Sequence, residues 1–98
     1  MALKTILNYS PNFNPKKRTY KKIKFIIFHY TGMQKESEAI DRLINIQSEV
    51  SSHYLIQRNG TINVMVPDLY VAWHAGKSSW KGFKSLNKNS IGIEISNP

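Results

Sequence analysis

The stretch that decides the fold is Phe25-Ile26-Ile27-Phe28-His29-Tyr30-Thr31-Gly32. A run of large apolar side chains followed by His, Tyr, Thr and Gly is typical of a buried strand with polar residues at its carboxyl end. In open α/β sheets, ligands bind at the carboxyl ends of the strands. His29 in that position can therefore serve as a metal ligand or as an acid/base group. A core histidine that is hydrogen-bonded to backbone remains the alternative, because one His alone is not a metal site.

The composition limits the chain to one domain of 98 residues, and its hydrophobic fraction of 41% is typical of a globular protein. The absence of Cys excludes a disulfide framework and a thiolate metal site within this chain. The longest apolar run is too short to cross a bilayer. Residues 1–8 lack the apolar core of a signal peptide, so we expect a cytoplasmic protein without a membrane span, and a cell-envelope location is the alternative.

The order of the elements predicts a mixed β-sheet with at least one helix packed on it. Residues 1–22 contain Pro, Asn and Lys and are expected to form an extended arm. The elements that we expect are strands at 23–30, 53–57, 62–66, 71–74 and 91–95, and an amphipathic helix at 36–47. Asn59-Gly60 predicts a tight type I′ turn between the second and third strands. Because helix and hairpin signals flank residues 25–28, we expect them to form a central strand.

Glu94 is the second residue that the sequence singles out. It alternates with Ile93 and Ile95 in the last strand, so its side chain points to the opposite face of the sheet. A buried carboxylate without a partner is costly, so such a Glu is usually paired, exposed or functional. The alternative to a functional role is a solvent-facing Glu on a strand with one wet face.

Three further blocks accompany residues 25–32 in a fixed order, namely 50–56, 72–80 and 86–95. With them the chain resembles, from about Ser10 to its last residue, the zinc-dependent N-acetylmuramoyl-L-alanine amidases, which share a fold with peptidoglycan-recognition proteins. The resemblance implies an α/β fold with a mixed sheet flanked by helices, incomplete in this chain. Residues 23–98 would be the N-terminal portion of an amidase domain whose remainder follows residue 98. Without that remainder, one apolar face of the sheet would be left uncovered.

The resemblance also implies roles for individual residues. His29 would be a zinc ligand, and the other protein ligands would lie outside this chain. Glu94 would be catalytic, taking a proton from the metal-bound water and stabilising the tetrahedral intermediate. The residues implied in substrate binding are Tyr30, His74, Ala75 and Trp80. An internal zinc site made of His29, His53 and His74 is a less favoured alternative. The resemblance places His53 in the hairpin strand, either in a structural role or next to the metal ligands, and it places His74 on the substrate groove.

The net charge of +8 calls for an acidic partner or a solvated surface. Nucleic acid is one such partner, but no nucleic-acid motif is present, so we expect none to bind. Free carboxylates of peptidoglycan stem peptides would also suit a basic rim. A Lys-rich solvated surface is the simplest reading.

The function that we expect is hydrolysis of the amide bond between N-acetylmuramic acid and L-alanine of muropeptides, with zinc as cofactor. This chain alone, with one zinc ligand, is expected to be inactive. The alternative is a non-catalytic peptidoglycan-binding module. Expected partners are a peptidoglycan or muropeptide substrate and the C-terminal remainder of the same domain.

Overall fold

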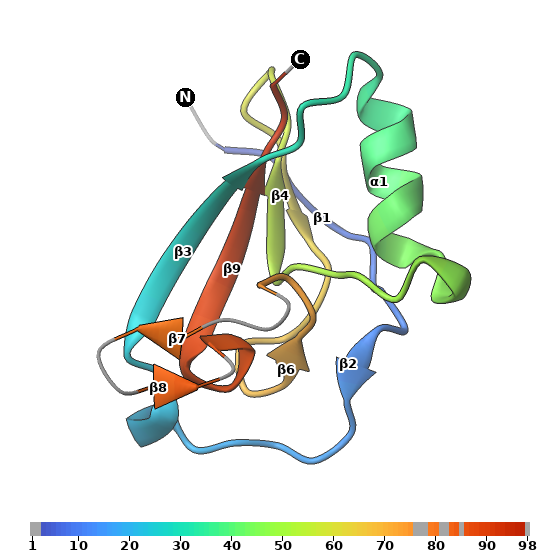
Figure 1. Cartoon of the computed structure of the whole chain (residues 1–98). Helices are drawn as coiled ribbons and strands as arrows, with labels where there is room; N and C mark the ends of the chain where they lie inside the picture. Colours follow the sequence, from blue (N-terminus) through green and yellow to red (C-terminus); the bar gives the residue numbers. More distant parts are fainter. Residues whose placement is uncertain (1–2, 76–78, 81–82, 85, 98) are drawn as a thin grey trace.

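A five-stranded mixed sheet lies at the centre of the molecule (Figure 1). The computed structural model describes residues 3–75, 79–80, 83–84 and 86–97. In spatial order the strands are β1 (Thr5–Leu7), β5 (Ile62–Val64), β4 (Tyr54–Ile56), β9 (Ser90–Ile95) and β3 (Phe25–Tyr30). Strands β4 and β5 are antiparallel, whereas β9 is parallel to both β3 and β4. The predicted mixed sheet is therefore confirmed.

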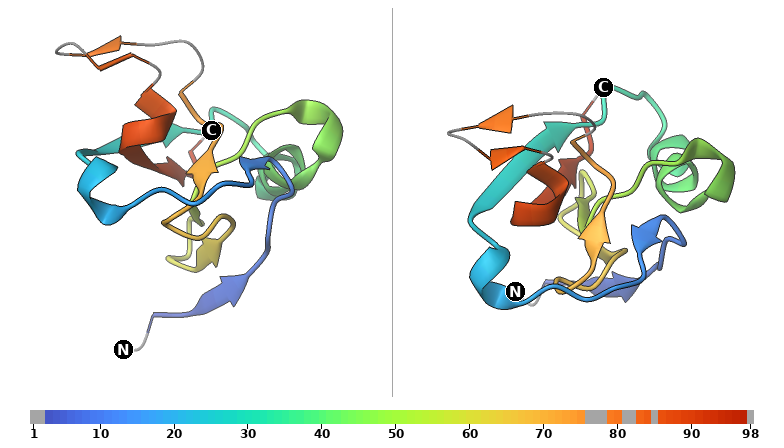
Figure 2. Two further views of the ribbon diagram at one scale, coloured as in Figure 1. Left: turned by 90° about the horizontal axis from the view of Figure 1, so that it is seen from below. Right: turned by 60° about the horizontal axis from the view of Figure 1, so that its bottom comes forward.

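Two small ribbons and three short helical turns complete the described fold. β2 (Phe13–Asn14) pairs with β6 (Val71–Ala72), and β7 (Ser79–Trp80) pairs with β8 (Phe83–Lys84). The 3₁₀ turns are η1 (Tyr20–Lys22), η2 (Ile46–Ser48) and η3 (Leu86–Asn89). Both views of Figure 2 place the β7–β8 ribbon and the helix α1 (Glu36–Ile44) at opposite ends of the molecule. In the described ranges, no helix has the length and apolar character needed to span a membrane.

Helix α1 covers one face of the sheet because its apolar residues recur at helical spacing. Ala39 and Leu43 are buried, and Leu43 packs against Leu55 of β4 and Met65. Two carboxylates, Glu36 and Glu38, lie in the first turn, where they interact favourably with the helix dipole. The helix starts where the sequence predicts but ends at Ile44, since Asn45 is extended, and the turn η2 follows as a separate element.

On the opposite face of the sheet, the part formed by β3 is apolar and left exposed by the described residues. Along β3, every second side chain is exposed: Ile26 by 61%, Phe28 by 59% and Tyr30 by 68%. On the neighbouring strand β9, Ile91, Ile93 and Ile95 are only partly buried. This confirms the expectation that one apolar face would lack a covering layer.

The expectation that residues 25–28 form a central strand is wrong for the described chain. Strand β3 lies at one edge of the five-stranded sheet and pairs only with β9 there. A continuous apolar run shows that a strand is suited to burial on both faces. It carries no information about which strands flank it, and this is why the prediction failed.

The N-terminal segment contains β1, β2 and the turn η1, and it is packed into the same fold. Strand β1 pairs with β5 in parallel, and Ser10 and Asn12 are buried. Arg18, which follows two lysines in the sequence, is only 7% exposed. Its guanidinium donates to the backbone carbonyl groups of Asp68, Asn87 and Lys88, and so joins the loop after β5 to η3.

The β4–β5 turn differs from the predicted type I′ geometry, which requires positive φ at two successive residues. Gly60 has a φ of +89°, but Asn59 is not among the residues with positive φ. The Asn59 side chain instead accepts a hydrogen bond from the Thr61 amide, and the Gly60 amide donates to the Gln57 carbonyl. The loop therefore resembles the longer hairpin turns in which a single glycine adopts the left-handed conformation.

Candidate active site

Strands β3 and β9 bring His29 and Glu94 together. The two residues are direct partners in the parallel register, one residue before the last pair of the ladder. Paired residues on adjacent strands project their side chains from the same face. The two groups singled out in the sequence therefore lie side by side near the carboxyl ends of two parallel strands, where a ligand site is expected.

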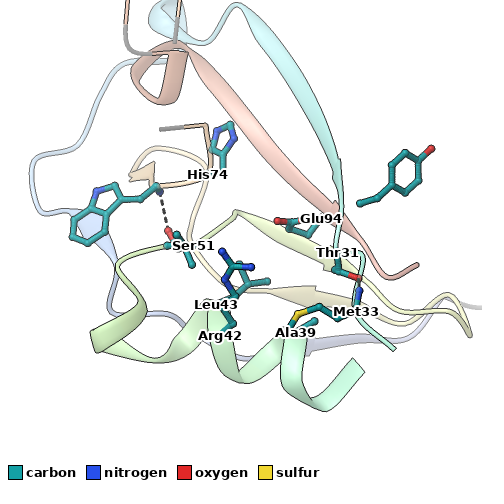
Figure 3. A pocket seen from close by; sticks show the side chains of 11 residues that line it. Thr31, Met33, Ala39, Arg42, Leu43, Ser51, His74 and Glu94 are labelled. Carbon is teal, nitrogen blue, oxygen red and sulfur yellow. Dashed lines mark hydrogen bonds between the residues drawn. The ribbon is translucent and has the colours of Figure 1, made fainter. Parts of the chain in front are cut away.

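A pocket of about 130 Å³ lies between this edge of the sheet and helix α1 (Figure 3). Its lining comes from the end of β3, from α1, from the segment before β4, from the segment after β6 and from β9. The lining residues are Tyr30, Thr31, Met33, Ala39, Arg42, Leu43, Val50, Ser51, Trp73, His74 and Glu94. Aliphatic surface from α1 thus faces a small set of polar side chains, which is the usual composition of a ligand site.

Glu94 is set up to exchange protons. Its Oε2 atom is buried and has no hydrogen-bond partner among the described residues. Burial raises the pKa of the Glu94 carboxyl group, and the charges of His29 and Arg42 oppose this shift. A carboxylate that is partly desolvated in this way is a stronger base than one in water.

A chain of hydrogen bonds sets the tautomers of two histidines. Ser90 Oγ donates to the Leu86 carbonyl, so it accepts from His74 Nε2 at 2.9 Å. The Nδ1 atom of His74 is then the acceptor that faces His29 Nε2 at 3.1 Å. Burial is the main reason that the pKa of His74 falls to about 3, so this imidazole is neutral. His29 accordingly presents a protonated Nε2 to His74.

His53 has a structural role, as the resemblance implies. Its Nδ1 atom accepts from the Gly92 amide at 3.0 Å, so Nε2 carries the proton and donates to the Tyr70 carbonyl at 2.7 Å. Both ring nitrogens are therefore engaged. The described residues contain no group of three potential ligands that could hold a metal ion. This geometry disfavours the internal three-histidine site.

Gly92 makes room for the His74 imidazole. A Cβ atom at position 92 would lie 2.4 Å from Cγ of His74, and hydrogen bonds to Ser90 and His29 hold that ring in place. We expect Gly92→Ala to destabilise the fold by about 1–3 kcal/mol, the usual cost of overpacking. Thermal unfolding measures this change. In a His74→Ala background the same substitution should cost little, and an equal cost in both backgrounds would contradict the assigned contact.

Of the residues predicted to bind substrate, some lie at the pocket and others do not. His74 lines the pocket, and Ala75 follows it with an amide that donates to Asn87 Oδ1 at 2.7 Å. Tyr30 is among the lining residues, but it alternates with His29 along β3, so its exposed ring belongs to the apolar face. The structure thus does not bring this ring together with His29 and Glu94. The side chain of Trp80 lies outside the described part of the structure.

Sequence reasoning missed two residues that shape the pocket. Arg42 lines it from α1, one helical turn after Ala39, a spacing that could have placed it beside the buried stripe. Arg58 directly precedes the Asn59-Gly60 turn in the sequence. Its guanidinium donates to the carbonyl groups of Met33 and Gln34, at 2.9 and 2.8 Å. It therefore fixes the loop between β3 and α1, and no local sequence pattern signals this contact.

Trp73 combines packing with hydrogen bonding at the back of the pocket. Its backbone amide donates to Ser51 Oγ at 2.9 Å, which is the dashed line in Figure 3. Its indole Nε1 donates to Asn14 Oδ1 at 2.8 Å. Trp73 thus links this wall of the pocket to β2 of the N-terminal segment.

Comparison with known proteins decides the family. A family model described as N-acetylmuramoyl-L-alanine amidase matches residues 19–98. The chain belongs to the N-acetylmuramoyl-L-alanine amidase family. It is 39% identical over 85 residues to the N-acetylmuramoyl-L-alanine amidase AmiD of Escherichia coli K12, covering 80% of this chain and 30% of AmiD.

Solved structures agree with this family assignment. The complex of Escherichia coli AmiD with the substrate anhydro-N-acetylmuramic acid-L-Ala-D-γ-Glu-L-Lys matches with a TM-score of 0.69 and 38% identity, over 86% of this chain and 34% of that one. A crystal structure of an AmpD derivative matches with a TM-score of 0.74 and 25% identity, over 97% of this chain and 61% of that one. The amidase-like fold is therefore confirmed, and the chain spans only part of the length of the amidases that it matches.

Proposed function

We propose that the protein to which this chain belongs hydrolyses the amide bond between N-acetylmuramic acid and L-alanine in muropeptides. The observation that carries this proposal is the pairing of His29 and Glu94 in register at the edge of a pocket. Family membership supports it, and so does the muropeptide bound to the related AmiD.

We further propose that zinc is the cofactor, with His29 as one of its ligands. His29 suits this role, because its imidazole lies at the end of a rigid strand, next to a carboxylate that is not paired with another residue of the described chain. A catalytic zinc needs about three protein ligands, and the described residues contain no such group, so the others must come from outside them. When bound, zinc supplies a Lewis acid that polarises the carbonyl group and lowers the pKa of water.

The roles of this chain's own residues follow from their positions. The carboxylate of Glu94, which lines the pocket, accepts the proton of the attacking water and returns it to the leaving amine. Ser90 and His74 hold His29 in a fixed orientation through their hydrogen bonds. The walls formed by α1 and Trp73 exclude water from one side of the carboxylate.

A second segment is needed to complete the fold that we propose. The face of β3 that carries Ile26, Phe28 and Tyr30 exposes three large apolar side chains in succession, and contiguous exposed apolar surface often marks a contact with another segment or chain. We propose that the part of the amidase domain to which this chain has no counterpart covers this face and supplies the missing zinc ligands. That part can belong to the same polypeptide or to a separate one.

A non-catalytic peptidoglycan-binding module is the second candidate. It needs only the pocket of about 130 Å³ beside Glu94, whose lining combines apolar and polar side chains. Such a module would keep the pocket and bind muropeptide without cleaving it.

Peptide release from a purified muropeptide separates these two functions. We expect the intact protein to release the stem peptide when zinc is present, to stop when a chelator removes the metal, and to resume when zinc is added back. Mass spectrometry of the products identifies the bond that is cleaved. Binding of muropeptide without cleavage, in protein shown to contain zinc, would contradict the amidase proposal and support the binding module.

A further inference from the structure

The pocket beside Glu94 contains one permanently charged cation among the described residues that line it, Arg42. It projects from α1, and Figure 3 shows its side chain directed into the pocket, toward the side where Glu94 and His74 lie. Arg42 is exposed, so its guanidinium is accessible to a ligand.

The described residues do not satisfy the donors of this guanidinium. No hydrogen bond or ion pair from it to another described side chain or backbone carbonyl is present. Its charge acts on Glu94 at longer range and lowers the pKa of that group. However, Glu94 Oε2 is itself without a hydrogen-bond partner, so the two groups are not a closed salt bridge. Arg42 is thus positioned at the pocket with its fork of N–H groups available.

A guanidinium in this setting selects for a planar anion. Arginine binds carboxylates with two parallel N–H···O bonds, which gives both strength and geometric specificity. Under the proposed function, the ligand carries one anionic group close to the reacting bond. In the substrate bound to AmiD, glutamate is linked through its γ-carboxyl group, so its α-carboxylate is free. In an extended peptide this carboxylate lies about 7 Å from the carbonyl carbon of the cleaved amide.

We propose that Arg42 binds the free α-carboxylate of the γ-linked glutamate in the stem peptide and thereby selects acidic over amidated stem peptides. The inference rests on the proposed function, because it assumes a muropeptide ligand with its reacting amide at Glu94. Arg42 on α1 and Glu94 on β9 then contact the two ends of one short segment of the ligand. Arg42 acts as a specificity-determining residue and takes no part in proton transfer.

Two muropeptides that differ only at this group test the proposal. One carries the free α-carboxylate of the γ-linked glutamate, and the other carries the corresponding primary amide. We expect the intact wild-type protein to bind and cleave the acid better than the amide. Arg42→Gln should raise KM and Kd for the acid by about 10- to 100-fold, the usual loss for a hydrogen-bonded charged pair. It should change the values for the amide, and kcat for both, by less than about twofold.

Lys35→Gln is the matched control, because Lys35 is an exposed cation just before α1 that does not line the pocket. It removes the same charge and should leave the preference for the acid unchanged. Equal losses for acid and amide in Arg42→Gln would show a structural role, and no loss for either would show that Arg42 does not contact the ligand. Both results overturn the inference.

The two proposals fail in different ways. If the wild-type protein cleaves neither muropeptide, the amidase function fails, while the Kd values for acid and amide still test Arg42. If it cleaves both equally well, and Arg42→Gln changes neither, the function stands and the inference about Arg42 fails.

Discussion

Turnover should fall by about 10²- to 10⁴-fold when Glu94 is replaced by glutamine, the usual loss when a general base is removed. Glutamine keeps the size of the side chain and one oxygen acceptor, but its amide group cannot act as a base. Because Glu94 lies beside the proposed metal ligand and is not assigned as a ligand itself, zinc content should stay unchanged. Muropeptide binding should also persist. The measurements are the rate of stem-peptide release, the metal content and Kd, all on the intact protein.

Glu38→Gln is the control for this experiment. Glu38 is an exposed carboxylate in the first turn of α1 and does not line the pocket. Its replacement removes the same charge and should leave turnover close to that of the wild type. Near-normal turnover of Glu94→Gln would refute the assignment of Glu94 as base, even though the family and fold would stand.

His29→Ala is expected to remove both zinc and activity. Loss of one of about three protein ligands leaves a site too weak to retain the metal during purification. The His29 imidazole is also the hydrogen-bond partner of His74 Nδ1, so the His74 ring loses this bond in the variant. Metal analysis and the peptide-release assay measure the two effects separately. A His29→Ala protein that still contains about one zinc per chain would show that His29 is not a ligand.

His74→Ala distinguishes between the two neighbouring imidazoles. His74 lies 3.1 Å from His29 but is assigned to the pocket wall, so its replacement should leave zinc bound. If His74→Ala loses zinc as completely as His29→Ala, then His74 is a ligand and the assigned ligand set is wrong.

Local sequence patterns were sufficient for the elements that carry the site. The apolar run ending at His29 formed β3, and the alternation around Glu94 formed β9. Their roles came from the ordered blocks of the resemblance, and the register then placed the two residues side by side. Period and turn signals are local properties, so they can be identified without knowledge of the tertiary fold.

Features that depend on distant parts of the chain could not be predicted in this way. The position of β3 at the sheet edge is set by which strands pair with it, and the burial of Arg18 is set by carbonyl groups about 50 to 70 residues away. The roles of Arg58 and Arg42 also depend on the folded chain. Arg58 fixes the loop between β3 and α1, and Arg42 lines the pocket. The local sequence around a basic residue is the same whether its side chain is solvated or hydrogen-bonded to a distant part of the chain.

The pairing of β3 with β9 has a consequence for the order of folding. It joins the early part of the chain to its last described strand, and Thr31 bonds to Asn97, which is 66 residues away. Closing so long a loop has an entropic cost that must be met before any of these contacts form, so proteins with such pairings fold slowly. During synthesis, His29 emerges from the ribosome well before Glu94. The two groups can meet only once β9 has been made and has docked beside β3, so a chain that ends before β9 has the histidine without its partner carboxylate.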